Sequence, residues 1–386
     1  MENVIGKIEN GFLKICLIDK VDSLNAAAVE EEMNRIEAEN SNLPILVDCE
    51  KLNYISSAGL RIMLRLKKAH NEMKIINTSV EVYDIFEMTG FTTIMTVEKA
   101  YKVLNVEGCP IIGHGANGIV YRYDPETVVK VYKNADSLDE IKHEREVARK
   151  ALILGIPTAI SYDIVKVGDS YASVFELINA KSLTNILAEE PDRISELVDI
   201  YVKLLHQIHE TIVPEGTLPK QKDVFVKWAA NLKGHLPDDI HAKLTKLIAD
   251  IPEDNHMVHG DCHTKNIMLQ GDEVILIDMD TLCVGNPVFE FAPIFLAYNG
   301  FGAVDHEKVT KFIDMSWEQA QYILDETIKR YFKVDDPTPY MDRIRLLGFT
   351  RLLERVYRKD KDNVKLIEFS QKQIVDLVNK LDKVYF

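Results

Sequence analysis

The stretch His259-Gly260-Asp261-Cys262-His263-Thr264-Lys265-Asn266, followed by Ile277-Asp278, indicates a phosphoryl-transfer site. An Asp and an Asn five residues apart on a tight loop, with a second Asp at the end of the next strand, are the side chains that this chemistry requires. Asp261 can orient and deprotonate an attacking hydroxyl, while Asn266 and Asp278 can hold Mg²⁺ on ATP. Because such a triple can arise by chance in an acidic chain of 386 residues, the interpretation requires further parts upstream.

A glycine-rich segment upstream matches the pattern G-x-G-x-x-G-x-V, with its glycines at Gly113, Gly115 and Gly118. The pattern alone is weak, because a hairpin turn with positive φ also selects glycine. Apolar runs at 119–121 and 127–132 follow the glycines, separated by a turn, whereas a dinucleotide-binding fold would continue into a helix. The segment therefore predicts a β-hairpin that lies over phosphates, as in kinases.

Lys130 lies within an apolar, β-branched run, where a charge is costly without a partner. It is either an edge-strand lysine that reaches solvent, or a ligand of the α- and β-phosphates braced by a glutamate of the next helix. That helix is expected at about 137–154 and offers Glu144 and Glu146, which project about 200° apart. Because Glu144 shares its helix face with apolar residues, it is predicted to be the partner of Lys130.

Together these segments resemble the aminoglycoside phosphotransferase and choline kinase branch of the protein-kinase-like fold, over residues 110–386. The resemblance implies an α+β domain of two lobes that binds ATP and Mg²⁺. Its small lobe would span about 110–178 as a twisted antiparallel sheet with one helix. A mainly helical large lobe would span about 179–386, with strands at 257–260 and 274–278 on either side of the catalytic loop.

The same resemblance assigns roles to individual residues. Asp261 would be the catalytic base, Lys130 would contact the phosphates, and Asn266 and Asp278 would be the Mg²⁺ ligands. The hinge that binds adenine through its backbone would lie at 175–178. Its predicted nucleotide-binding positions are Glu176 and Ile178.

Two positions depart from the related families. Protein kinases carry Lys two residues after the catalytic Asp, whereas this chain has His263, which favours the small-molecule branch and makes His263 a candidate catalytic residue. That branch usually braces the catalytic loop with a further Asp, where this chain has Glu290. His259 is expected to orient the loop, Asp280 either to contact the metal region or to cap a helix, and Cys262 to be inert.

Residues 1–104 alternate strands with helices and are expected to form a separate α/β domain. Asn10-Gly11 predicts a tight hairpin between strands at 4–9 and 12–17. The further elements expected are a helix at 26–39 capped by Ser23 or Asn25, a strand at 43–49, a helix at 58–70, a strand at 73–77 and a helix at 80–88, ended by Gly90.

Within this domain, Ser56 and Ser57 end a strand and begin a helix. Either they cap the helix, or Ser57 is a phosphorylation site, since a phosphate there would meet free backbone amides and the positive helix end. The order of elements and the segment 54–60 resemble a STAS domain, the fold of bacterial anti-anti-sigma factors. The family usually has Asp where this chain has Ser56, and the regulated serine falls on Ser57. The resemblance implies a regulatory or docking domain with a protein partner.

Composition narrows the function classes. A net charge of −15 argues against nucleic acid as a partner. No apolar run approaches the length of a membrane span, the start of the chain has no secretory signal pattern, and five scattered cysteines fit a reducing compartment, so a cytoplasmic location is expected. The linker at 105–109 is short, which predicts that the first domain lies close to the small lobe.

The acidity is uneven. From Asp305 onward the chain has 16 Lys and Arg against 15 Asp and Glu, which does not support the acidic pocket that a cationic antibiotic would favour. Arg351, Arg355 and Arg358 share one helical face, which is either solvated surface, a site for an anionic acceptor, or a partner contact.

Two functions remain open at this stage. The first is an ATP- and Mg²⁺-dependent phosphotransferase that acts on a hydroxyl of an unidentified small molecule and is regulated or localised by the first domain. The second is a partner-switching signalling protein whose kinase domain phosphorylates Ser57 or a protein partner. A nucleotide-binding protein without activity is disfavoured by the intact set of Asp261, Asn266 and Asp278.

Overall fold

The computed structural model describes residues 3–40, 43–115, 117–134 and 137–386. Ala116, within the glycine-rich segment, lies outside these described residues. Contacts between residues divide the chain into two compact units, each with its own hydrophobic core. The first comprises Met1–Asn105 together with Ile164–Asp169, and the second comprises Val106–Asp163 together with Ser170–Phe386.

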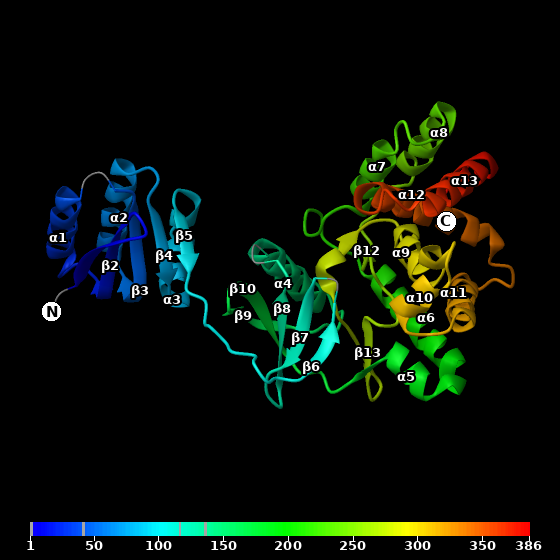
Figure 1. The fold of residues 1–386 in the computed structure, drawn as a ribbon, viewed down its shortest axis with the longest axis horizontal. Helices are drawn as coiled ribbons and strands as arrows, with labels where there is room; N and C mark the ends of the chain where they lie inside the picture. The colour runs from blue at the N-terminus through cyan, green and yellow to red at the C-terminus, as the bar shows by residue number, and fades with distance from the viewer. Residues whose placement is uncertain (1–2, 41–42, 116, 135–136) are drawn as a thin grey trace. The chain divides into compact units, whose positions relative to one another are not determined.

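The first unit is built on a five-stranded sheet in the order β1-β2-β3-β4-β5 (Figure 1). β1 runs antiparallel to β2, whereas β2–β3, β3–β4 and β4–β5 are parallel pairs. The strands are β1 (Val4–Glu9), β2 (Phe12–Val21), β3 (Ile45–Ile55), β4 (Lys74–Thr78) and β5 (Thr96–Lys99). The helices are α1 (Ala26–Glu39), α2 (Ser57–Ala69), α3 (Val80–Met88) and the short η1 (Phe91–Thr93).

The core of the first unit lies between this sheet and its helices. Ile15 of β2, Val47 of β3 and Ile75 of β4 have no exposed surface, and they belong to the same apolar cluster as Met63 of α2 and Phe86 of α3. The alternation of buried and exposed residues along β2 shows why this segment forms a half-buried strand.

The predicted hairpin is confirmed, because Asn10 and Gly11 both have the positive φ (50° and 81°) that a two-residue hairpin turn requires. The predicted cap of α1 is wrong. Asn25 occupies the N-cap position, but its side chain accepts a hydrogen bond from the Asp22 amide instead of capping the helix. β2 and β3 continue past their predicted ends, and the four-residue β5 was not predicted.

The second unit begins with a five-stranded sheet in the order β6-β7-β8-β10-β9, whose edge strand β9 runs into the segment Ile164–Asp169 that is grouped with the first unit. The pairs β6–β7, β7–β8 and β8–β10 are antiparallel. Its elements are β6 (Ile111–His114), β7 (Gly118–Arg122), β8 (Thr127–Tyr132), α4 (Leu138–Ile153), β9 (Ser161–Val167) and β10 (Ser170–Glu176). This sheet with one helix confirms the predicted small lobe.

The rest of the second unit is mainly helical, as predicted for the large lobe. Its helices are α5 (Leu183–Glu189), α6 (Ile194–Glu210), α7 (Gln221–Asn231), α8 (Asp238–Ala249), α9 (Val288–Tyr298), α10 (Glu307–Ile313), α11 (Trp317–Phe332), α12 (Thr338–Lys359) and α13 (Val364–Lys380), with short η2 (Pro191–Arg193), η3 (Met279–Thr281) and η4 (Gly300–Gly302). Its short strands are β11 (Lys181–Ser182), β12 (Met257–Val258), β13 (Ile267–Gln270), β14 (Glu273–Leu276) and β15 (Cys283–Val284). They form the sheets β11-β13-β14 and β12-β15.

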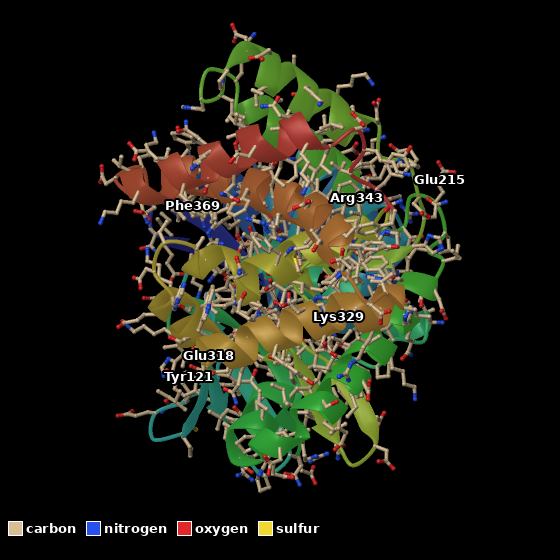
Figure 2. All side chains as sticks on the ribbon, turned by 90° about the vertical axis from the view of Figure 1, so that its right-hand side faces the viewer. Tyr121, Glu215, Glu318, Lys329, Arg343 and Phe369 are labelled. Atoms are coloured by element: carbon tan, nitrogen blue, oxygen red, sulfur yellow. The ribbon has the colours of Figure 1, made fainter. Side chains whose placement is uncertain are left out.

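Helix α9 lies at the centre of this lobe. Each of its residues is buried, and both α11 and α12 pack against it. Figure 2 looks onto these C-terminal helices, with Lys329 on α11 and Phe369 on α13. Because α9 is apolar on all sides except at Glu290, that carboxylate must have partners inside the protein. None of the described helices is both long enough and apolar enough to cross a membrane.

The strands beside the catalytic loop are shorter than predicted. β12 ends at Val258 and β14 at Leu276, before the predicted ends at Gly260 and Asp278. The reason is local, since Gly260 (φ 82°) and Asp278 (φ 64°) have left-handed backbone, which departs from the extended conformation of a regular strand. Helices α7 and α8 were not predicted, and α7 lines the cavity described below.

Candidate active site

The loop that connects β12 to β13 is held by Glu290 of α9. The buried Glu290 carboxylate accepts hydrogen bonds from the backbone amides of His259 at 2.6 Å and Gly260 at 3.1 Å. Burial alone would raise the pKa of Glu290, but His209 and the donated hydrogen bonds outweigh it and lower that pKa, so the group is charged. At Gly260 a Cβ would lie 2.8 Å from the carbonyl oxygen of Thr281, so the loop requires glycine there.

Asp261 and Asn266 lie together on this loop. Asp261 keeps about a third of its side chain exposed (33%), so a substrate can reach its carboxylate. The Asn266 side-chain nitrogen donates to the Asp261 carbonyl at 3.0 Å, which leaves the amide oxygen available as a ligand. His259 Nδ1 accepts a hydrogen bond from the Asp261 amide at 3.3 Å, so His259 orients the loop as expected.

His263 is buried beside this carboxylate. Its Nε2 lies 3.6 Å from Asp261 Oδ2, and its ring meets Phe312 edge-on. Burial lowers the pKa of His263, which favours the neutral ring. Cys262 is fully buried, and burial raises the pKa of its thiol, so Cys262 is inert as expected.

The described residues fit a Mg²⁺ site that is completed by phosphates. Among them no group of three or more His, Cys, Asp or Glu side chains could hold a metal by itself. The backbone amide of Ile277 donates to the Asn266 carbonyl at 3.0 Å, which brings Asn266 next to Asp278. One carboxylate and one amide oxygen are the kind of partial shell that Mg²⁺ accepts when phosphates and water supply the rest.

Asp280 lies close to this pair, in the short helix η3 that Asp278 begins. Burial, together with the neighbouring charge of Asp278, raises the pKa of Asp280. The Asp280 side chain therefore belongs to the electrostatic environment of the predicted metal region, and it forms no capping hydrogen bond with the described residues.

Lys130 of β8 joins the small lobe to this region. Its Nζ lies 2.9 Å from Glu144 Oε1 and 3.3 Å from Asp278 Oδ1. Burial alone would lower the pKa of Lys130, but the Glu144 and Asp278 carboxylates outweigh the effect of burial and raise that pKa. Glu144 also accepts a hydrogen bond from the Tyr132 hydroxyl at 2.5 Å. Glu146 is paired with Lys150 instead, so the glutamate that faces the sheet is Glu144.

The glycine-rich segment forms the turn between β6 and β7, and the Gly115 amide donates to the Gly118 carbonyl at 2.9 Å. Gly113, Gly115 and Gly118 all lack positive φ, so turn geometry does not explain them. At Gly118 a Cβ would lie 2.6 Å from the Val131 carbonyl oxygen, and strand packing therefore requires glycine. The nearest atoms to a Cβ at Gly113 or Gly115 are 3.6 Å away, so small residues there leave space above the backbone.

The predicted hinge at 175–178 includes the last two residues of β10, which ends at Glu176. The Leu177 amide donates to the Glu126 carbonyl at 2.6 Å, so this amide is already satisfied by the protein. The Glu176 carboxylate accepts a weak hydrogen bond from the Tyr162 hydroxyl at 3.4 Å. Ile178 is the last residue of this segment and remains a predicted contact of the adenine base.

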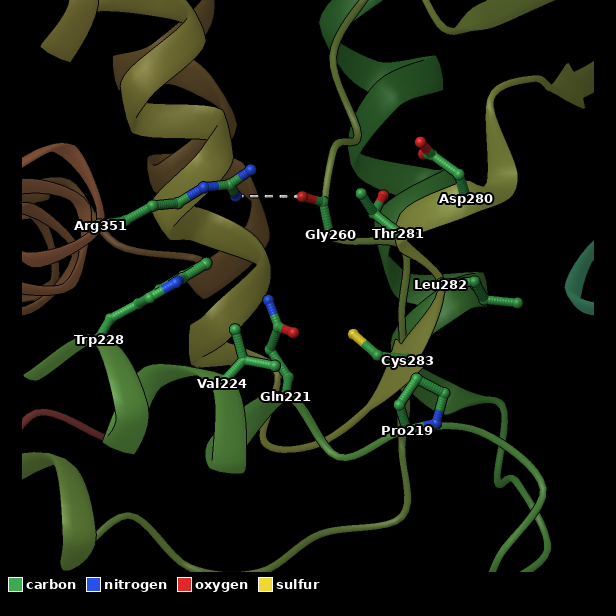
Figure 3. A pocket seen from close by; sticks show the side chains of 10 residues that line it. All are labelled: Pro219, Gln221, Val224, Trp228, Gly260, Asp280, Thr281, Leu282, Cys283 and Arg351. Carbon is green, nitrogen blue, oxygen red and sulfur yellow. Dashed lines mark hydrogen bonds between the residues drawn. The ribbon is translucent and has the colours of Figure 1, made fainter. Parts of the chain in front are cut away.

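A cavity of about 240 Å³ lies beside the catalytic loop (Figure 3). It is lined by residues in or next to η3, β15, α7 and α12 and by one residue of the loop between β12 and β13: Pro219, Gln221, Val224, Trp228, Gly260, Asp280, Thr281, Leu282, Cys283 and Arg351. Arg351, Arg355 and Arg358 form the arginine stripe of α12. The interpretation of this stripe as solvated surface is wrong for Arg351, which is half-buried and donates to the Gly260 carbonyl at 3.2 Å. Gln221 and Trp228 were not predicted as site residues, because no local sequence motif marks a helix residue that faces a cavity.

In the first unit, Ser57 is exposed at the first turn of α2. The N-cap residue is Ser56, whose hydroxyl accepts a hydrogen bond from the Ala58 amide at 3.2 Å. The capping role therefore belongs to Ser56, and the Ser57 hydroxyl is not needed for it.

Comparisons with known proteins agree with both units. A family model described as "Phosphotransferase enzyme family" matches residues 109–321, more than half of the chain, and a STAS domain model matches residues 5–103. The two-lobed fold and its catalytic loop define the class of protein kinase-like phosphotransferases. The chain belongs to the phosphotransferase enzyme family and carries a STAS domain before it.

Individual relatives were found for each part. "Putative anti-sigma factor antagonist BtrV" of Bordetella bronchiseptica is 33% identical over 101 residues, which cover 25% of this chain and 85% of that protein. A thermostable mutant of aminoglycoside phosphotransferase APH(4)-Ia, in a ternary complex with ADP and hygromycin B, is 16% identical, with a TM-score of 0.50 over 79% of this chain and 99% of that chain. At this identity the structural likeness shows the fold alone.

Proposed function

We propose that this protein transfers the γ-phosphoryl group of ATP to a hydroxyl of a small molecule, and that its first domain regulates or localises this activity. The observation that carries the proposal is the ion pair of Lys130 with both Glu144 and Asp278, at 2.9 and 3.3 Å. This contact joins β8 of the small lobe to Asp278, which follows β14 and lies next to Asn266 of the loop that holds Asp261. A purely structural lysine would not need two carboxylates from different lobes.

The reaction follows from where these side chains lie. The amides of the glycine-rich turn and the Lys130 ammonium would hold the phosphates of ATP. Asp261, whose carboxylate is partly exposed, would accept the proton of the incoming hydroxyl. The hydroxyl oxygen then bonds to the γ-phosphorus, the bond from that phosphorus to the β-phosphate oxygen breaks, and ADP leaves.

Asn266 and Asp278 would hold Mg²⁺, which supplies charge neutralisation on the phosphates when bound. Glu290 keeps the loop amides of His259 and Gly260 in place, so Asp261 is positioned before substrate binds. The neutral His263 beside Asp261 can adjust the orientation of that carboxylate without competing for its proton. Each of these contributions is electrostatic or positional, as phosphoryl transfer requires.

The choice of a small-molecule acceptor rests on the residues of the loop. His263 stands where protein kinases carry lysine, and an aminoglycoside phosphotransferase of similar fold binds ADP and hygromycin B.

We propose domain limits of 1–104 and 110–386, with a linker at 105–109. The five cysteines are free, which supports a proposed reducing, cytoplasmic setting.

The test is transfer of label from γ-labelled ATP, with Mg²⁺, into a mixture of metabolite hydroxyl compounds. Label should move into a small molecule with the wild-type protein and should not move with the Asp261→Asn variant. If neither ATP consumption nor labelled product depends on Asp261, the proposal fails.

A second candidate function is supported by the exposed Ser57 at the start of α2. A phosphate on Ser57 would meet the amides of the first helical turn, and it would change the charge of a docking surface. In the same assay, label on the protein itself that disappears in both the Ser57→Ala and Asp261→Asn variants would establish a signalling switch. Label on the protein that persists in Ser57→Ala would exclude Ser57 as the acceptor.

A further inference from the structure

Arg351 of α12 is a half-buried cation next to the catalytic loop. Its Nη1 donates to the Gly260 carbonyl at 3.2 Å, and within the described part of the chain it forms no ion pair with a carboxylate. The guanidinium has five N–H donors, so most of its hydrogen-bonding capacity is not used by the protein. Burial lowers the pKa of Arg351, although Asp261 and Glu290 partly offset this effect.

The neighbouring arginines of the same helix face have different surroundings. Arg355 lies over the Phe301 ring at 5.5 Å, and Arg358 is paired with Glu354 at 3.5 Å. Both are exposed, and neither lines the cavity. Arg351 is therefore the member of the stripe that faces a space in which a ligand can bind.

Figure 3 shows the Arg351 guanidinium directed across the cavity toward Gly260, with the Trp228 ring close to it. The guanidinium carbon lies 5.6 Å from the centre of that ring. Apart from Arg351, the polar side chains at the cavity are Gln221, Thr281 and Asp280. The Thr281 hydroxyl already donates to the His259 carbonyl at 2.7 Å, and Asp280 lies on the far side of Thr281 from Arg351 in Figure 3.

The position of the cavity connects it to the chemistry. Gly260 lines it, Asp261 is the next residue, and the Asp261 carboxylate is near enough to act on the charge of Arg351, so a molecule held by Arg351 would place its other end near that carboxylate. A volume of about 240 Å³ suits a compound of on the order of ten non-hydrogen atoms, if each occupies roughly the space of a water molecule.

We propose that Arg351 binds an anionic group, a carboxylate or a phosphate, of the hydroxyl-bearing acceptor, and that Trp228 packs against the carbon skeleton of that acceptor. The inference rests on the proposed phosphotransferase function and names the class of its substrate. A cationic acceptor would have to approach the Arg351 guanidinium, which has no ion pair among the described residues, while the Asp280 carboxylate of the cavity lining lies beyond Thr281, so amine-rich compounds are disfavoured.

The test uses the fluorescence of Trp228 in the full-length protein. The chain has two tryptophans, and Trp317 is stacked on His306 away from this cavity, so a Trp317→Phe background leaves Trp228 as the only reporter. With Mg²⁺ and a non-hydrolysable ATP analogue present, the protein is titrated with glycerate against glycerol, ribose 5-phosphate against ribose, and choline. The first pair probes carboxylate recognition and the second probes phosphate recognition.

A saturable fluorescence change is expected with at least one anionic compound and not with its neutral counterpart or with choline. Arg351→Gln should weaken that binding by about tenfold or more, the usual effect of losing a charge-assisted hydrogen bond. Arg351→Lys should retain part of the affinity, and Arg358→Gln is the matched control that should leave it unchanged. Thermal unfolding of each variant checks that the fold is intact.

The inference is overturned if no anionic compound gives a saturable change, if neutral or cationic compounds bind equally well, or if Arg351→Gln leaves the affinity within about twofold. The proposed phosphotransferase function is tested separately by ADP release. A protein that turns over Mg·ATP but shows no preference for anions would overturn this inference alone.

Discussion

Glu290 Oε2 accepts a hydrogen bond from the His259 backbone amide at 2.6 Å inside a fully buried environment. An Asp is expected at this place from the family resemblance, and Glu290, one methylene longer, still reaches the loop. The same carboxylate holds the Gly260 amide at 3.1 Å. One buried charge on an otherwise apolar helix therefore positions the residues next to Asp261.

Glu290→Gln is expected to lower the free energy of unfolding of the second unit by about 1–3 kcal/mol, because two amides lose a charged acceptor. Turnover should fall as well, since Asp261 loses its fixed position. Both tryptophans, Trp228 and Trp317, lie in the second unit, so urea unfolding followed by their fluorescence reports on this unit. Equal stability of the variant and the wild type would show that the two hydrogen bonds contribute nothing.

The contribution of Glu290 should also depend on pH. Its folded-state pKa is lowered, so its stabilisation is fully present above the unfolded value of about 4.3 and is lost as the pH falls through the folded value. Between pH 7 and pH 3 the wild type should therefore lose more stability than Glu290→Gln. Parallel pH dependence of the two proteins would contradict this.

Asp278→Ala should weaken the binding of Mg·ATP, because the predicted metal site has one carboxylate and one amide ligand, and the variant keeps only the amide. Lys130 would also lose the partner at 3.3 Å but keep Glu144. Nucleotide affinity is measured by calorimetry with Mg²⁺ and with EDTA. The wild type should bind more tightly with Mg²⁺ than without it, and the variant should show little difference. A variant that keeps the full Mg²⁺ dependence would exclude Asp278 as a ligand.

Gly118→Ala should lower the free energy of unfolding by about 1–3 kcal/mol, as overpacking usually does. A Cβ there would lie 2.6 Å from the Val131 carbonyl oxygen, which is backbone and cannot easily move. Gly115→Ala is the matched control, since the nearest atom to its Cβ would be 3.6 Å away. Urea unfolding should place the control close to the wild type. Equal losses in both variants would show that close strand packing is not the reason for glycine at 118.

Much of the fold could be predicted from sequence, because its signals are local. The Asn10-Gly11 turn predicted the hairpin, and the segment 80–88 predicted α3 with its observed bounds. Strand ends at Gly260 and Asp278 were predicted too far along the chain, because only the three-dimensional loop gives these residues left-handed backbone.

The candidate site likewise has residues that the sequence predicted and residues that only the structure shows. Asp261, Asn266 and Asp278 are recognisable because their spacing is set by one loop and one hairpin. Arg351 and Trp228 come from α12 and α7, more than a hundred residues apart, and only the packing of these helices brings them together. Their sequence signals, an arginine stripe and a single aromatic residue, are equally typical of solvated surface and of core.

The central claim is that Asp261 is the base of an ATP-dependent phosphotransferase. It is tested most directly by measuring, for wild type and Asp261→Asn, the rate of ADP formation with Mg²⁺ and the affinity for a non-hydrolysable ATP analogue. The account predicts that turnover falls by about 10²-fold or more, the usual contribution of a general base, while the affinity stays close to that of the wild type. Equal turnover of the two proteins, or a wild-type protein that does not bind the nucleotide, would contradict it.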